Sequence, residues 1–189
     1  VSGGLRSLLL SRGEEPGHHM IRSLVPVSTR EPGLEAVPDN RVSLMLPYLP
    51  VDVADPQQRL AAVRSRLRTL RGAGEPVAGA TATAVAAYGP FPPVSLGVRL
   101  AFHLPHRTVI TVTTNVPGPR QPLYGLGRRV LEMLPYVPIA DRVRIGVAMF
   151  SYCGTLTFGI TGDFTTVPDI DVLAAGISDS MAELVRLAG

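Results

Sequence analysis

The feature that most constrains the fold of this sequence is a strand–turn–strand pattern between residues 142 and 161. Apolar side chains recur at every second position on both sides of Ser151–Gly154, a segment whose composition predicts a hairpin turn. A period of two places successive side chains on opposite faces of a strand, so each half has one apolar face. The apolar positions are Val143, Ile145, Val147 and Met149 before the turn and Leu156, Phe158 and Ile160 after it.

Segments typical of helices and strands are mixed along the rest of the chain. Strands are predicted at residues 21–27, 41–49 and 108–114, with a short extended piece at 121–124. Helices are predicted at residues 2–12, from Asp55-Pro56 to Gly72, and from Pro168-Asp169 onward. The last of these has an apolar stripe of Leu173, Ile177, Met181 and Leu184. This mixture predicts an α/β fold with a mixed β-sheet flanked by helices.

Composition supports one folded domain. The 189 residues are enough to bury a core, and 46% of them are hydrophobic against 17% charged, which excludes a disordered chain. The single cysteine, Cys153, excludes a disulfide framework and a cysteine-built zinc site.

The basic residues are all arginine, 18 in number, and the isoelectric point is about 9.5. This charge permits weak attraction to phosphate-bearing ligands or anionic membrane surfaces. Nucleic acid is a poor fit, because the arginines are scattered and no basic stripe contains interleaved aromatic residues.

A stretch without charge runs from residue 76 to residue 98 and is long enough to cross a bilayer. It consists largely of alanine, glycine and threonine, and Gly89-Pro90 and Pro92-Pro93 interrupt it. We therefore predict a small-residue helix packed inside the protein, with a patch that rests on a membrane or guards an apolar channel as the alternative. The first residues show no signal-peptide pattern.

The histidines are the natural candidates for a general base. No carboxylate follows His18-His19 at a useful spacing, and His103 and His106 flank a turn-like Leu-Pro pair. Exposed loop positions explain both pairs, and a metal site is not expected because no Asp or Glu follows either pair closely. Cys153 lies in the predicted turn, far in sequence from any histidine, and is interpreted as a turn or core residue rather than a nucleophile.

The most informative motif is Asn-Val-Pro-Gly-Pro at residues 115–119. We expect the preceding strand to end at Asn115, with Pro117 fixing φ at the first turn position and Gly118 supplying a positive φ at the second. Pro119 would then prevent the strand from resuming. The Asn115 amide can either hold this turn or point into a cleft and bind a ligand. The other asparagine of the chain, Asn40, also adjoins a predicted strand.

These residues resemble the paired motifs of the bacterial wax ester synthase/diacylglycerol acyltransferase family, in which Pro-Leu-Tyr follows, here at residues 122–124. Further segments resemble the C-terminal half of that family in the same order, so the resemblance covers nearly the whole chain. They are residues 2–6, 25–28, 40–43 and 144–163. The family has a chloramphenicol acetyltransferase-like fold of two α/β lobes with a tunnel between them. The resemblance implies that residues 1–189 form one C-terminal lobe.

The resemblance implies supporting roles for residues of this chain. Asn115, Pro117, Gly118 and Pro119 would line the tunnel or shape its loop, and Tyr124 would close an acyl channel, with a core position as the alternative. Asn40 would lie near the cleft. Arg41 would bind a phosphate of CoA, with a surface ion pair as the alternative.

The catalytic signature of the family, His-His-x-x-x-Asp-Gly, belongs to its N-terminal lobe. His18-His19 is followed by Ser23-Leu24 where Asp-Gly is required, so no catalytic role is carried over to it. The resemblance implies acyl-CoA as co-substrate, no cofactor, diacylglycerol or a long-chain alcohol as acceptor, and the N-terminal lobe as partner. It further implies a cytoplasmic protein that contacts a membrane or lipid droplet.

Two other functions remain open from the sequence. The chain can be a catalytically inactive lipid-binding or interaction lobe with the same fold. It can also be part of a condensation-type acyltransferase that acts on carrier-protein thioesters.

Overall fold

A computed structural model describes residues 1–28, 42–72, 109–139 and 143–189. Asn40, Arg41, His103, His106 and the uncharged stretch at 76–98 lie outside the described residues, so the predictions made for them stay predictions.

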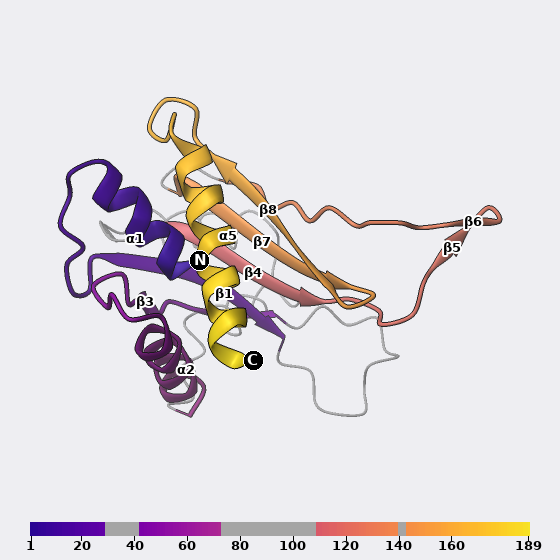
Figure 1. Cartoon of the computed structure of the whole chain (residues 1–189), viewed down its shortest axis with the longest axis horizontal. Coiled ribbons are helices and arrows are strands. Elements are labelled where there is room, and N and C mark those ends of the chain that lie inside the picture. Colours follow the sequence, from indigo (N-terminus) through magenta and orange to yellow (C-terminus); the bar gives the residue numbers. More distant parts are fainter. Residues whose placement is uncertain (29–41, 73–108, 140–142) are drawn as a thin grey trace, which may run out of the picture.

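A mixed β-sheet forms the centre of the fold (Figure 1). Its strand order is β2-β1-β4-β7-β8, and β3 also pairs with β1. Strands β1, β4 and β7 are mutually parallel, whereas β2, β3 and β8 are antiparallel to their neighbours. The bounds are β1 Ile21–Ser28, β2 Val42–Met45, β3 Tyr48–Leu49, β4 Val109–Pro117, β7 Ile145–Tyr152 and β8 Thr155–Gly162. The predicted mixed sheet is confirmed.

The three predicted helices are also present, as α1 (Ser2–Ser11), α2 (Pro56–Gly72) and α5 (Ile170–Ala188). Asp55 caps α2 as its position predicts, since its Oδ1 accepts a hydrogen bond of 2.7 Å from the backbone N–H of Gln58. Asp169 precedes α5, but its side chain makes no capping hydrogen bond.

Helices α1 and α5 lie side by side over one face of the sheet (Figure 1). They approach closely because small residues meet where they pack. A Cβ on Gly4 would lie 2.8 Å from the backbone nitrogen of Ile177, and one on Gly176 would lie 3.0 Å from the Cα of Gly4. Beneath the helices the core includes Leu5, Leu8, Val147, Leu173 and Ile177. The predicted stripe of α5 is therefore buried at its first two positions.

The predicted hairpin is confirmed with shifted bounds. Strand β7 begins at Ile145 rather than Arg142 and continues through Tyr152. The turn therefore consists of Cys153 and Gly154 alone, with φ of 47° and 85°. Two consecutive residues with positive φ match the right-handed twist of the flanking strands.

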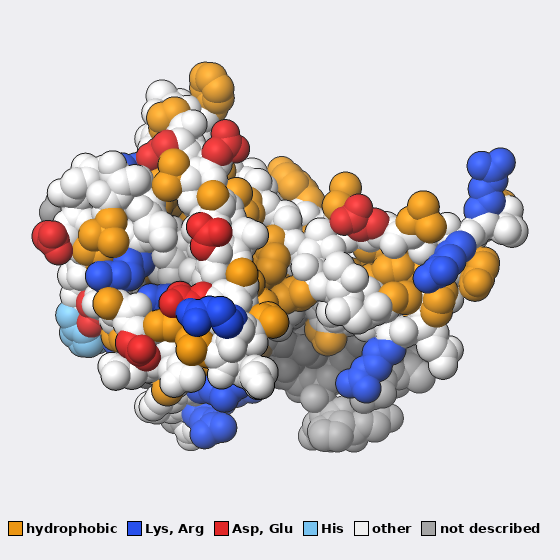
Figure 2. All heavy atoms as spheres, viewed as in Figure 1, with side chains coloured by type: hydrophobic (Ala, Val, Ile, Leu, Met, Phe, Trp, Pro, Cys, Tyr) orange, Lys and Arg blue, Asp and Glu red, His pale blue; other side chains and the backbone are white. Residues whose placement is uncertain are grey.

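Residues 118–139, here called the arm, connect β4 to β7 and extend beyond the end of the sheet (Figure 1). A two-stranded hairpin, β5 (Tyr124–Gly125) with β6 (Arg128–Arg129), forms its tip. Figure 2 shows hydrophobic side chains along the arm and basic side chains near its tip. Of the extended piece predicted at residues 121–124, only Tyr124 lies in a strand, as the first residue of β5.

The second half of the arm returns across the sheet, where β7 and β8 have glycines. A Cβ on Gly146 would lie 2.9 Å from a methyl group of Val137, and a Cβ on Gly159 would lie 1.8 Å from the carbonyl oxygen of Pro135. Side chains at these positions would thus occupy the space of the arm. Glycine at these two positions lets the backbone of the arm lie close to the backbones of β7 and β8.

Candidate functional site

The candidate site lies where the parallel strands β4 and β7 end. Both strands run in the same direction, and Pro117, the last residue of β4, is in register with Ser151. In open α/β sheets the carboxyl ends of parallel strands are the usual position of ligand sites. The Asn-Val-Pro-Gly-Pro motif begins on β4 and crosses this edge.

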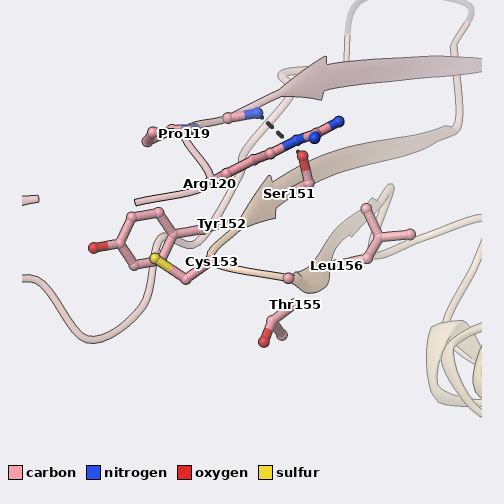
Figure 3. Close-up of a pocket in the computed structure, with 9 residues that line it drawn as sticks. Pro119, Arg120, Ser151, Tyr152, Cys153, Thr155 and Leu156 are labelled. Atoms are coloured by element: carbon pink, nitrogen blue, oxygen red, sulfur yellow. Dashed lines mark hydrogen bonds between the residues drawn. The ribbon is translucent and has the colours of Figure 1, made fainter. Parts of the chain in front are cut away.

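A pocket of about 450 Å³ opens at this edge (Figure 3). Its walls come from the start of the arm and from the β7–β8 hairpin. The lining residues are Gly118, Pro119 and Arg120 from the arm and Ser151, Tyr152, Cys153, Gly154, Thr155 and Leu156 from the hairpin. The pocket therefore combines apolar side chains such as Leu156 with the hydroxyl groups of Ser151 and Thr155 and the guanidinium of Arg120.

Two hydrogen bonds join the motif to the hairpin. The backbone N–H of Gly118 donates to the Oγ of Ser151 at 3.1 Å (Figure 3). The N–H of Cys153 donates to the carbonyl oxygen of Pro119 at 3.0 Å. Since the Oγ of Ser151 accepts from the backbone, its hydroxyl proton is available to another acceptor.

The conformation predicted for the motif is wrong in two respects. Strand β4 does not stop at Asn115 but continues through Pro117, because pairing with β7 extends to that residue. Gly118 is not among the residues with positive φ. A Cβ at this position would lie 2.1 Å from the carbonyl oxygen of Ser151 and 2.5 Å from the Phe150 ring, so close approach explains the glycine.

Asn115 is exposed and lies on β4, not in a turn. It is on the same face as the buried Thr113, two residues earlier, and it pairs in register with Met149. Of the predicted site residues, Gly118 and Pro119 line the pocket, whereas Asn115 and Pro117 are not among its lining residues. The side chain of Asn115 is therefore exposed two residues before the end of β4.

Tyr124 lies out on the arm and is 70% exposed, so the alternative core position is wrong. Its suggested place at an acyl channel stays a prediction.

Tyr152 was missed by the sequence analysis, which assigned it to the turn. Its hydroxyl accepts a hydrogen bond from the N–H of Leu123 and donates to the carbonyl oxygen of Val130, both at 2.9 Å. The N–H of Val130 in turn donates to the carbonyl oxygen of Leu123 at 2.9 Å. Tyr152 therefore joins the two segments of the arm that flank its tip hairpin, here called the legs of the arm, and it also lines the pocket. The position of a tyrosine just before a hairpin turn was the only signal in the sequence for this role. Its partners, Leu123 and Val130, are more than twenty residues away and could not be predicted from it.

His18 and His19 are exposed in a loop, as predicted. The expectation that no carboxylate approaches them is wrong, because Oδ2 of Asp52 lies 3.0 Å from Nδ1 of His18. This hydrogen bond is the main cause that lowers the pKa of Asp52. Within the described ranges, no three His, Cys, Asp or Glu side chains are grouped as metal ligands. None of the described helices has both the length and the apolar character that crossing a membrane requires.

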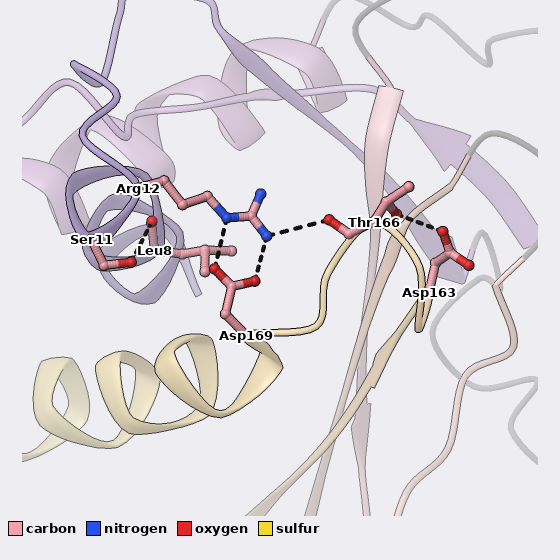
Figure 4. Close-up of polar contacts among 6 residues, drawn as sticks. All are labelled: Leu8, Ser11, Arg12, Asp163, Thr166 and Asp169. Carbon is pink, nitrogen blue, oxygen red and sulfur yellow. Dashed lines mark hydrogen bonds and ion pairs between the residues drawn. The ribbon is translucent and has the colours of Figure 1, made fainter.

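An ion pair at the far end of the helices joins α1 to α5 (Figure 4). Arg12 donates from Nε to Oδ2 of Asp169 at 2.8 Å and from a second nitrogen to Oδ1 of the same carboxylate. This bidentate contact lowers the pKa of Asp169 below its ordinary value of 3.8. A lowered pKa means that the pair stabilises the folded state above that ordinary value and loses its effect as the pH falls through the folded-state pKa.

We accordingly expect Asp169→Asn to lower the urea midpoint of unfolding at about pH 7 and to differ progressively less from wild type as the pH falls below about 3.8. Asp179→Asn, on an exposed turn of the same helix, controls for the loss of one negative charge. A deficit that persisted unchanged at about pH 3 would contradict this account.

Comparison with solved structures identifies the class of fold to which this chain belongs. The fold is that of a chloramphenicol acetyltransferase-like α/β domain, and it matches the solved structure of the wax ester synthase/diacylglycerol acyltransferase from Marinobacter aquaeolei VT8 with a TM-score of 0.67. That match has 23% sequence identity and covers 100% of this chain and 41% of the other.

The family itself follows from the sequence. The family model described as "WS/DGAT C-terminal domain" matches residues 39–185, and the chain therefore belongs to this family of wax ester synthase/diacylglycerol acyltransferase C-terminal domains. Proteins named "Probable diacyglycerol O-acyltransferase tgs1" from two Mycobacterium tuberculosis strains, H37Rv and CDC 1551, are 48% and 47% identical over 188 residues. Each match covers 100% of this chain and 41% of the relative, so the chain spans about two-fifths of the length of these relatives.

Proposed function

We propose that this chain is the C-terminal lobe of an acyl-CoA-dependent O-acyltransferase that makes triacylglycerol from diacylglycerol, or wax ester from a long-chain alcohol. The family match over residues 39–185 carries the proposal, and the names of the two Mycobacterium tuberculosis relatives support the diacylglycerol acceptor. The pocket at the Asn-Val-Pro-Gly-Pro motif would form part of one wall of the tunnel between two lobes.

In the proposed reaction the acceptor hydroxyl attacks the thioester carbonyl of acyl-CoA. An ester C–O bond forms, the C–S bond breaks, and the hydroxyl proton passes through a base to the departing CoA thiolate, which becomes the free thiol. That base would come from the N-terminal lobe. The part of this lobe is to position both reactants, which lowers the barrier by removing translational and rotational freedom.

Groups on this lobe have the chemistry for that positioning. The exposed amide of Asn115 can donate to a carbonyl oxygen, and the Ser151 hydroxyl retains a proton for a second acceptor. Arg120, in the pocket wall, is an exposed cation and would suit the phosphates of CoA. The phosphate role inferred for Arg41 from the family resemblance remains part of the proposal, as does the place near the cleft inferred for Asn40.

Replacement of Asn115 tests this proposal. In the full-length protein, Asn115→Ala is expected to lower the transfer of a labelled long-chain acyl group from CoA to diacylglycerol by about a hundredfold, the usual effect of losing one positioned donor. Asn115→Asp, which keeps the shape but removes the N–H donors, should be impaired as well. Gln57→Ala removes an exposed amide on α2 and serves as the matched control.

Thermal unfolding of the same variants separates the two roles of Asn115. Activity lost at unchanged stability supports the tunnel wall. Stability lost in proportion to activity would instead assign Asn115 a structural role at the strand end. A full-length protein that binds acyl-CoA or diacylglycerol without any transfer would favour the inactive lipid-binding lobe.

A further inference from the structure

Helix α2 carries a disproportionate share of the positive charge of this chain. It contains five of the 18 arginines and no acidic residue. The other 172 residues carry 13 arginines against 15 acidic residues, so their net charge is −2, whereas that of the whole chain is +3. The excess of positive charge is therefore a property of one helix rather than of the whole surface.

Two of the five arginines point toward the rest of the protein. Arg59 is 8% exposed, and its Nη1 donates to the carbonyl oxygens of Val53 and Ala54, both at 2.9 Å. The Nη1 of Arg66 donates to the carbonyl oxygen of Tyr48 at 2.9 Å. These bonds fix the rotation of α2 about its own axis, and they also determine which face of the helix points outward.

The other three arginines, Arg64, Arg68 and Arg71, are exposed and are here called the basic stripe. Spacings of four and three residues place them on one face of the helix. Arg68 follows Arg59 by about 2.5 turns, so the stripe lies opposite the buried arginine. Figure 2 shows basic side chains gathered at the end of α2, at the lower edge of the view.

Acidic groups compensate the inner side of α2. Burial lowers the pKa of Arg59, and the carboxylates of Glu183 on α5 and of Asp55 oppose that effect. Asp55 also caps the first turn of the helix through the N–H of Gln58. These two carboxylates thus act at the start of α2 and on the side that faces α5, away from the basic stripe.

The shape of the basic stripe fits a plane of many anions rather than one bound anion. Its three side chains start about 4.5 to 6 Å apart along the axis and leave the outer flank of a helix, so they do not converge on a single phosphate. None of them lines the pocket at the end of β4 and β7. Phosphate headgroups of an anionic membrane form such a plane, and guanidinium groups bind phosphate oxygens through paired N–H donors.

We propose that the outward face of α2, defined by Arg64, Arg68 and Arg71, rests on an anionic phospholipid surface and is held there by charge. The isoelectric point permits such attraction anywhere on the chain, whereas the arrangement of α2 confines it to one helix face. Each arginine near an anionic surface raises the partition coefficient about fivefold, so the three together raise it about a hundredfold. This inference does not depend on the proposed acyltransferase reaction.

Cosedimentation of the full-length protein with vesicles tests the inference. The vesicles contain phosphatidylcholine with phosphatidylglycerol, or phosphatidylcholine alone. Arg64→Ala/Arg68→Ala/Arg71→Ala is expected to lower the partition coefficient on the mixed vesicles about a hundredfold, toward the value on phosphatidylcholine alone. Alanine favours helices, so circular dichroism should show an unchanged fold. Undiminished binding by this variant would overturn the proposal.

A variant with the same loss of charge provides the control. Arg128→Ala/Arg129→Ala/Arg186→Ala removes three exposed arginines outside α2 and should keep most of the vesicle binding. Equal losses in the two variants would mean that binding follows net charge, which contradicts a defined contact face.

Salt and soluble phosphate separate a membrane surface from a small ligand. Binding by wild type should fall steeply as the salt concentration rises, because ions screen exposed charges. Adding CoA at constant ionic strength should release no more protein than chloride does. Selective release by CoA would identify the basic stripe as a site for a soluble phosphate and would overturn the proposal.

Photocrosslinking gives a measurement of position. p-Benzoylphenylalanine replaces Ala61, which is exposed on α2 one turn before Arg64, and is expected to crosslink to phospholipid on the mixed vesicles. The same replacement of Phe164, which is 92% exposed in the β8–α5 loop, gives the background. Equal lipid yields at the two positions, or crosslinks from residue 61 to protein alone, would contradict the assigned face.

The inference and the proposed function can fail separately, because vesicle binding requires no turnover. An inert protein that binds anionic vesicles through the basic stripe would refute only the acyltransferase reaction. An active protein whose vesicle binding ignores the basic stripe would refute only the contact face.

Discussion

Valine in place of Gly159 is expected to destabilise the protein by about 3 kcal/mol, the upper part of the usual cost of overpacking. The added Cβ would lie 1.8 Å from the carbonyl oxygen of Pro135, a backbone atom that no side-chain rotation can move. The returning leg of the arm would have to lift from β8. Strand propensity alone predicts the opposite sign, because valine favours strands and glycine does not. Urea denaturation measures the difference.

Gly125→Val is the matched control for this substitution. Gly125 is also a strand glycine, on β5, but a Cβ there meets nothing within 4 Å. We expect its free energy of unfolding to stay within about 0.5 kcal/mol of wild type, as for most exposed substitutions. Similar values for the two variants would show that the arm does not rest on β8.

Truncation of Leu173 to alanine should lower the free energy of unfolding by about 3–4 kcal/mol. Leu173 is 0% exposed and belongs to the core in which α5 meets the sheet and α1. The loss combines the transfer free energy of the deleted methyl groups with the cavity that they leave.

The neighbouring residue on the same helix supplies the comparison for Leu173. Val172 is 36% exposed, and Val172→Ala should cost less than about 1 kcal/mol because alanine also favours the helix. Equal losses in the two variants would place the core elsewhere than beneath Leu173.

Local patterns were sufficient for most elements of this fold, although the single strand predicted at residues 41–49 is two strands, β2 and β3. The alternation around residues 142–161 predicted the β7–β8 hairpin, and the Asp55-Pro56 pair predicted the start of α2. In each case the signal and the structure depend on residues close together in sequence. The family motifs then predicted the architecture, and the match to the solved structure of the Marinobacter aquaeolei protein confirms that fold.

Contacts between distant segments were beyond such patterns. From the sequence we interpreted Gly118 as a turn residue with positive φ. In the structure it is required because a Cβ there would clash with Ser151 and Phe150 of another strand. The approach of Asp52 to His18 and the bonds of Tyr152 to both legs of the arm have the same character. Each requires the strand order and register, which no single segment encodes.

The position of Tyr152 has a thermodynamic consequence for the pocket. Its ring is part of the pocket wall and its hydroxyl holds both legs of the arm, so one side chain belongs to two surfaces. If a ligand in the pocket changes the preferred position of Tyr152, it shifts the conformation of the arm, and a shift of the arm changes the affinity of the pocket by the same factor. Such reciprocity would make the conformation of the arm and the occupancy of the pocket a single linked equilibrium.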